Sequence, residues 1–190
     1  MVQSNFGGIR NCLFINAQSK QTVPMLLAPL RRLGIAAAGI LDIDAVKEGG
    51  AVFSRLMRSA GIPEGLQESI GIQRRRVYER LAFSGKNMKT EGGINLLSGD
   101  DLLSAKEFFQ TMARYGILFV PCGELESWLS ELGITGHGPD WLIKVFEAMG
   151  EEPSAYGYAA PTEGDVWDFV REVGSWLQNP MRGGMNKTSQ

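Results

Sequence analysis

The stretch that decides the fold is AAAGILDIDAVKEGG, residues 36–50. Its first six residues are small or aliphatic without alternation, as in a central strand of a parallel sheet that is buried on both faces. Asp42 and Asp44 follow this apolar run directly. Because like charges repel and a carboxylate loses solvation near a core, this spacing predicts that a cation lies close to the two aspartates.

Hydrophobic patterns on either side of this stretch predict an alternating order of strands and helices. Short apolar runs predict strands over 12–16, 36–41 and 117–121. Apolar residues at helical spacing, with capping and stop residues at the ends, predict helices over 22–34, 51–61, 66–82, 100–116, 123–133, 138–150 and 163–178. This order indicates an α/β fold, a parallel sheet flanked by helices, with additional C-terminal helices.

Length and composition place the chain among ordinary soluble globular proteins. It has 190 residues, of which 44% are hydrophobic and 21% charged, and its net charge of -2 argues against bulk electrostatic binding to nucleic acid or membrane. No apolar run approaches the roughly 18 residues of a membrane span. The two cysteines lie in separate apolar runs and the N-terminus has no signal-peptide pattern, so we expect a cytoplasmic protein with reduced thiols.

Polar and acidic residues follow each of the expected strands. They are Asn16 after the first, Asp42 and Asp44 after the second, and Glu124 and Glu126 after the third. The carboxyl ends of parallel strands share one edge, where ligands bind in open α/β sheets, and oxygen ligands suit Mg²⁺ or Mn²⁺. The alternative is structural, because Asp44 could cap the next helix and Glu124 could favour a helix N-terminus without any metal.

Two longer segments carry a resemblance to a known family. NAQSKQTVPMLLAPLRRLGIAAAGILDIDAVKEGG (16–50) and YGILFVPCGELESWLSELGITGHGPDWL (115–142) resemble the Toprim domain, the metal-binding module of topoisomerases and primases. In particular, they look like the Toprim region of the OLD (overcoming lysogenization defect) family of ATP-dependent nucleases. The resemblance implies a Toprim-like (Rossmann-like) domain over 10–135, with a helical extension over 136–178 packed on it. The remaining residues, 179–190, are expected to form a disordered tail.

The resemblance also implies roles for individual residues. Asp42 and Asp44 match the metal-binding DxD of the family and Glu124 matches its later acid, with Glu126 as a further metal ligand. Asn16 stands where the family has a catalytic glutamate. The implied function is a Mg²⁺- or Mn²⁺-dependent endonuclease acting on DNA or another nucleic acid. The chain contains no GxxxxGK[ST] loop, so an ATPase domain or subunit is the implied partner, and a homodimer is left open.

Two other interpretations stay open. Asparagine cannot take up a proton near neutral pH, so Asn16 is compatible with a degenerate Toprim domain that binds metal, nucleic acid or a partner without cutting. The motif DIDAV also fits a haloacid dehalogenase-type phosphatase, in which Asp42 would be the nucleophile and Asp44 the acid/base.

A basic segment offers a route for nucleic acid. Residues 66–90 carry six basic side chains against two acids, Glu68 and Glu79, which gives a local charge of +4; the basic residues are Arg74, Arg75, Arg76, Arg80, Lys86 and Lys89. Such a patch can bind phosphates. The alternative is a solvated helix face, and three consecutive arginines cannot all share one face of a helix.

Overall fold

The computed structural model of the chain describes residues 11–130, 133–150, 152, 154, 156 and 164–185. Within these residues the elements follow one another as α1 (Val23–Arg32), β1 (Gly39–Asp42), η1 (Ile43–Lys47), α2 (Gly50–Ser59), α3 (Glu64–Phe83), η2 (Gly93–Leu96), α4 (Gly99–Ala113), β2 (Ile117–Val120), α5 (Leu125–Trp128), α6 (Gly138–Met149) and α7 (Asp165–Gln178).

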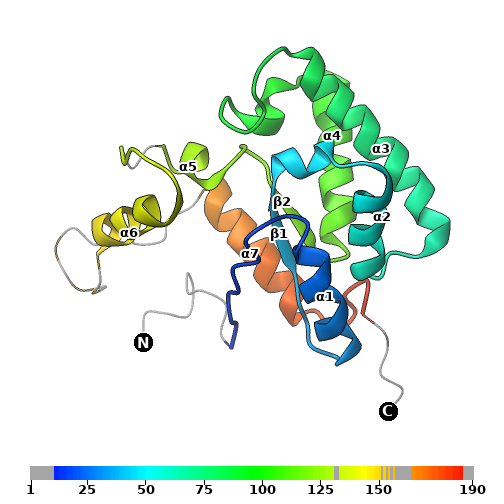
Figure 1. Cartoon of the computed structure of the whole chain (residues 1–190). Coiled ribbons are helices and arrows are strands. Elements are labelled where there is room, and N and C mark those ends of the chain that lie inside the picture. Colours follow the sequence, from blue (N-terminus) through cyan, green and yellow to red (C-terminus); the bar gives the residue numbers. More distant parts are fainter. Residues whose placement is uncertain are drawn as a thin grey trace.

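The two strands form a small parallel sheet with helices on both faces. β1 pairs with β2 in a register that runs from Gly39 opposite Ile117 to Asp42 opposite Val120. Figure 1 shows α7 on one side of the strands and α2, α3 and α4 on the other. Alternate residues of a strand point to opposite faces, so Phe119 joins the main core, whereas Leu118 packs against α7.

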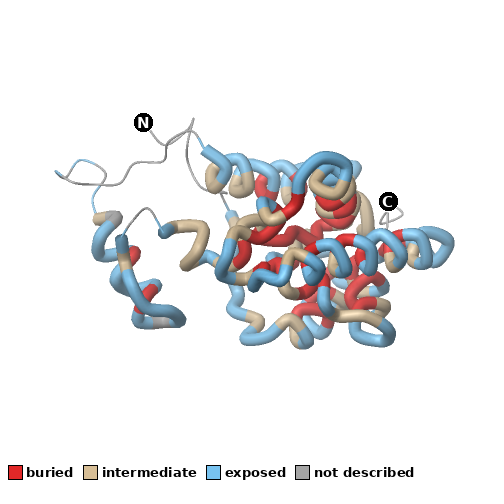
Figure 2. The backbone as a smooth tube through the Cα atoms, turned by 90° about the horizontal axis from the view of Figure 1, so that it is seen from above, coloured by how far each residue is buried: buried red, intermediate tan, exposed pale blue. Residues whose placement is uncertain are grey.

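The main core is built from the apolar stripes of α1 to α4. Phe108 of α4 is fully buried, and its ring lies 6.4 Å from Phe53 of α2 and 5.7 Å from Phe119 of β2, measured between ring centroids. Figure 2 shows the buried segments concentrated in this part of the molecule. In both views α6 lies to one side of it. Among the described residues no helix is both long and apolar enough to cross a membrane.

The coarse prediction of an α/β fold is confirmed, as a mostly helical structure with a two-stranded parallel sheet packed against helices. The strands predicted over 36–41 and 117–121 correspond to β1 and β2. Helices also form where apolar periodicity predicts them, except that the helix expected over 123–133 is reduced to the four residues of α5 in the described part of that range. There the Trp128 indole donates a hydrogen bond to Asp165 at the start of α7.

The strand predicted over 12–16 is wrong. Leu13, Phe14 and Ile15 are exposed and have no strand geometry, and β1 is paired on one edge only within the described residues. The physical reason is local. Asn11 and Gln18 adopt positive φ angles of 56° and 63°, so the chain turns at both ends of the run. Side-chain to backbone bonds in such turns compete with strand pairing.

The segment after α7 also differs from the expected disordered tail. Residues 179–185 form turns that pack on the body of the fold. Arg182 donates hydrogen bonds to the last carbonyl groups of α7, on Trp176 and Leu177, and the Gly183 amide donates to the Arg114 carbonyl. These contacts satisfy groups that a helix end leaves open. Residues 186–190 lie outside the described residues.

A buried arginine joins the segments that lead into the sheet. The Arg31 side chain, at the end of α1, donates hydrogen bonds to the carbonyls of Ala37, Ala60 and Tyr115 at 2.9, 2.7 and 2.9 Å. Burial lowers the pKa of Arg31 to about 10, which still leaves it charged at neutral pH. Its guanidinium also lies 4.9 Å from the centroid of the Trp176 ring of α7.

Replacing Arg31 should therefore destabilise the protein strongly. Arg31→Met leaves three carbonyls without their donor, and we expect the free energy of unfolding to fall by at least about 3 kcal/mol. Arg32→Met is the matched control, because Arg32 is the exposed neighbour and should change stability by less than about 0.5 kcal/mol. Urea unfolding followed by circular dichroism measures both. Equal effects in the two variants would contradict this role of Arg31.

Candidate functional site at the carboxyl edge of the sheet

Two carboxylates reach the same edge of the sheet from different strands. Asp42 is the last residue of β1 and lies opposite Val120, the last residue of β2. Glu124 follows β2 after a short turn and precedes α5. Parallel pairing with both strands ending in register therefore brings residues 42 and 124 together, although 81 residues separate them in the chain.

A lysine lies between these two carboxylates. The Lys89 Nζ atom is 3.2 Å from Asp42 Oδ2 and 3.4 Å from Glu124 Oε2. Burial by itself lowers the pKa of Lys89, but the hydrogen bonds and charges of Asp42 and Glu124 outweigh this, and the pKa is raised above its ordinary value of 10.5. One cation therefore already contacts acids from both strand ends.

Close backbone packing holds the Lys89 loop against the end of β2. A Cβ atom on Gly123, which has φ of +117°, would overlap the carbonyl of Lys89, and one on Gly93 would overlap the carbonyl of Pro121. The Ile94 amide also donates a hydrogen bond to Pro121 at 2.9 Å. Both positions therefore require glycine, because a side chain would prevent the close contact of the two backbone segments and because both φ angles are positive. This packing fixes the position of the loop that carries Lys89.

A second lysine holds the other acid of the DxD motif. Lys20 Nζ lies 3.1 Å from Asp44 Oδ2 and 2.9 Å from Glu48 Oε1. Burial lowers the pKa of Lys20, and the bonds to Glu48 and Asp44 more than reverse that effect, so its pKa is raised. Asp42 and Asp44 thus face different cations, because the chain turns into η1 between them with Ile43 fully buried.

The structure brings together part of the predicted metal set. Asp42 and Glu124 share Lys89, whereas Asp44 pairs with Lys20, and Glu126 accepts a hydrogen bond from the Gly138 amide at 3.1 Å. In the part of the chain that the structure describes, no three acidic, histidine or cysteine side chains gather closely enough to hold a metal ion. The four-acid metal site therefore stays a prediction.

Asn16, the residue at the position of the family glutamate, makes a local contact. Its Oδ1 atom accepts a hydrogen bond from the Gln18 amide at 2.7 Å, and the side chain is exposed. It also lines an apolar hollow between residues 11–17, α1 and β1. No hydrogen bond joins its side chain to Asp42, Asp44 or Glu124 among the described contacts. Asn16 therefore acts here as a turn residue.

Most side chains of the predicted basic patch bind acids or carbonyl groups of the protein itself. Arg74 is buried and donates to the Val46 carbonyl at 2.6 Å. Arg76 and Arg80 both pair with Asp101 of α4, at 3.9 and 3.4 Å. Lys89 belongs to the carboxylate pair described above. Within the described residues only two of the six predicted side chains make no ion pair or hydrogen bond, and they are Arg75 and Lys86.

Sequence reasoning missed the residues that bind the acids. Lys20 is not among the residues that the sequence predicts for the site, and Lys89 is predicted to bind nucleic acid. The sequence contains a signal for Lys20, which follows the strand expected over 12–16, but none for Lys89, which lies between two expected helices. No family model, curated protein or solved structure matches the chain.

The raised pKa of Lys89 has a measurable consequence. A lysine whose pKa is higher in the folded state stabilises the fold fully below its unfolded pKa, and that contribution is lost as the pH rises through the folded pKa. We expect Lys89 to titrate above 10.5 in the wild type and at a lower pH in Asp42→Asn, which removes one of its charge partners. NMR of the labelled lysine side chain measures the midpoint.

Asp101→Asn is the control for this titration, because Asp101 pairs with Arg76 and Arg80 and makes no contact with Lys89 among the described ion pairs. The same midpoint in the wild type and in Asp42→Asn would show that Lys89 does not bind Asp42 in solution.

Proposed function

We propose that the chain is a Toprim-like domain that binds a divalent metal ion, Mg²⁺ or Mn²⁺, at this edge and cleaves nucleic acid. The observation that carries the proposal is that a single cation, the Lys89 ammonium group, contacts carboxylates from the ends of both strands. Two carboxylates within reach of one cation are a suitable donor set for Mg²⁺, which is commonly bound by one or two carboxylates and several waters.

The chain's own residues would share the work as follows. Asp42 and Glu124 would hold the ion, which would stabilise charge on a phosphate and activate water when bound. Lys89 would leave these carboxylates as the ion arrives, and its ammonium group would remain nearby for a phosphate oxygen. Asp44 would join only after parting from Lys20. The proposal includes an ATPase domain or subunit as a partner, in keeping with the sequence resemblance.

Asn16 favours a second candidate, a domain that binds without cutting. Its amide cannot serve as a base, and its oxygen is engaged by the Gln18 amide. The two lysines already pair with all four carboxylates at this edge, so each acid has a cationic partner without a metal. In this case the domain would bind nucleic acid or a partner, including a second copy of itself, without breaking a phosphodiester bond.

The first test combines metal binding with cleavage. We expect Mn²⁺ binding, followed by electron paramagnetic resonance, to weaken in Asp42→Asn and to become tighter in Lys89→Gln, because the variant removes the competing ammonium group. Plasmid nicking in Mg²⁺ or Mn²⁺ should fall at least about 100-fold in Asp42→Asn. Asp101→Asn controls for loss of an ion-paired acid outside this edge.

The outcomes separate the candidates. Metal binding without nicking, together with nicking gained in Asn16→Glu, would support the non-cleaving domain. Hydrolysis of a simple phosphomonoester that is lost in Asp42→Asn, with no nicking, would support the phosphatase alternative. Absence of Mn²⁺ binding in the folded wild type and in Lys89→Gln would refute a metal site on these two carboxylates.

Nucleic-acid binding is tested separately, through the two residues of the basic patch whose side chains make no ion pair or hydrogen bond within the described residues. We expect Arg75→Ala/Lys86→Ala to weaken DNA binding and to lower the slope of log affinity against log salt by about 2, because about one counterion is released for each phosphate contact. Arg55→Ala/Lys106→Ala removes two exposed basic residues on other helices and is the control. Fluorescence anisotropy at several salt concentrations gives the slopes. Equal slopes for both double variants would exclude the predicted patch.

A further inference from the structure

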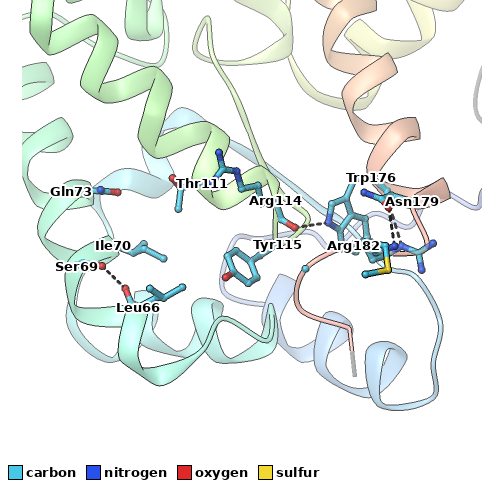
Figure 3. A pocket seen from close by; sticks show the side chains of 12 residues that line it. Leu66, Ser69, Ile70, Gln73, Thr111, Arg114, Tyr115, Trp176, Asn179 and Arg182 are labelled. Carbon is cyan, nitrogen blue, oxygen red and sulfur yellow. Dashed lines mark hydrogen bonds between the residues drawn. The ribbon is translucent and has the colours of Figure 1, made fainter. Parts of the chain in front are cut away.

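A hollow of about 540 Å³ lies at the opposite edge of the sheet from Asp42 and Glu124. Arg114 and Tyr115 on its wall directly precede β2, whereas Glu124 follows β2. Figure 3 shows side chains of α3 on one side of the hollow and those from the ends of α4 and α7 on the other. The space is of the size that small-molecule sites usually have.

The charge around this hollow is positive and has no acidic counterpart in the lining. Arg114 and Arg182 line it, and no aspartate or glutamate does. Buried Arg31 lies behind, with its guanidinium over the Trp176 ring, and its hydrogen bonds in the described part of the chain all go to carbonyl oxygens. In a chain with a net charge of -2, two guanidinium groups thus line the hollow and a third lies against Trp176 of its wall.

One of the three guanidinium groups is free to bind a ligand. Arg31 and Arg182 use their N–H groups on carbonyls of the fold. The Arg114 side chain is exposed and makes no hydrogen bond or ion pair within the described residues. Figure 3 shows it beside Thr111, across the hollow from Gln73. Arginine presents its N–H groups in a planar fork that matches phosphate oxygens.

The remaining wall combines apolar surface with two further donors. Leu66 and Ile70 of α3 and Met181 after α7 supply apolar side chains. The Gln73 amide and the Tyr115 hydroxyl have no hydrogen-bond partner in the part of the chain described, and both line the space. Figure 3 shows the Tyr115 ring between α3 and the Trp176 side. An anionic group joined to a flat ring matches this lining.

We propose that this hollow binds a small organic phosphate, a phosphate monoester carried by a flat ring, of which a mononucleotide is the test case. The phosphate binds the Arg114 guanidinium, with Gln73 and Tyr115 as further donors, and the ring lies on the apolar wall formed with Leu66 and Ile70. The site uses none of the acids at the other edge, so it does not rest on the nuclease proposal.

Isothermal titration of the full chain with AMP, adenosine and inorganic phosphate tests the proposal. We expect AMP to bind more tightly than either fragment, because only AMP uses both the guanidinium and the apolar wall. Arg114→Gln should weaken AMP binding by about ten- to a hundred-fold, the usual effect of losing a charge-assisted hydrogen bond. Adenosine binding should change little in that variant.

Arg55→Gln is the matched control, because Arg55 is an exposed arginine on α2 outside the lining, and it should leave AMP binding unchanged. Tyr115→Phe keeps the ring and removes one donor, so a smaller loss is expected. Circular dichroism confirms that each variant is folded. The proposal is overturned if AMP does not bind, if Arg114→Gln and Arg55→Gln bind it equally, or if AMP binding is abolished by Asp42→Asn.

Discussion

The fold depends on one buried guanidinium group. Arg31 leaves α1 and donates hydrogen bonds to the chain just before β1, at the end of α2 and just before β2. A buried charge without a carboxylate partner is costly, and the lowered pKa of Arg31 reflects that cost. Three carbonyl oxygens offset it only while all three segments stay in place. The group therefore couples the positions of both strand starts.

The parallel sheet carries this constraint from one edge to the other. With the strand starts fixed, four residues of ladder bring the strand ends together, and Asp42 and Glu124 meet there. Two carboxylates so placed require a positive charge. In this structure lysines from two loops supply it, so each acid of the DxD motif already has a cationic partner without metal.

The sequence predicts what depends on short-range periodicity. Helices such as α4 and both strands of the sheet follow from apolar patterns within one segment. The run at 12–16 shows where this fails, because turns at Asn11 and Gln18 override its apolar composition. Short-range patterns do not predict ion pairs between distant loops. The sequence therefore does not show which acids Lys20 and Lys89 contact. Arg74 is likewise predicted to bind nucleic acid, although it is buried and donates a hydrogen bond to the Val46 carbonyl.

Charge is divided between the two edges of the sheet, and this division matters more than the net charge. At the carboxyl edge four carboxylates and two ammonium groups, from Lys20 and Lys89, leave two negative charges. At the opposite edge two arginines and no acid line a hollow, and Arg31 lies against Trp176 of its wall. A polyanion approaching the carboxyl edge would still be repelled unless further positive charge arrived there. A divalent ion that displaced the Lys89 ammonium group from Asp42 and Glu124 would supply that charge and would free the lysine for a phosphate. On the proposed function, the lysine bridge would thus make phosphate binding at this edge depend on a metal, whether or not cleavage follows.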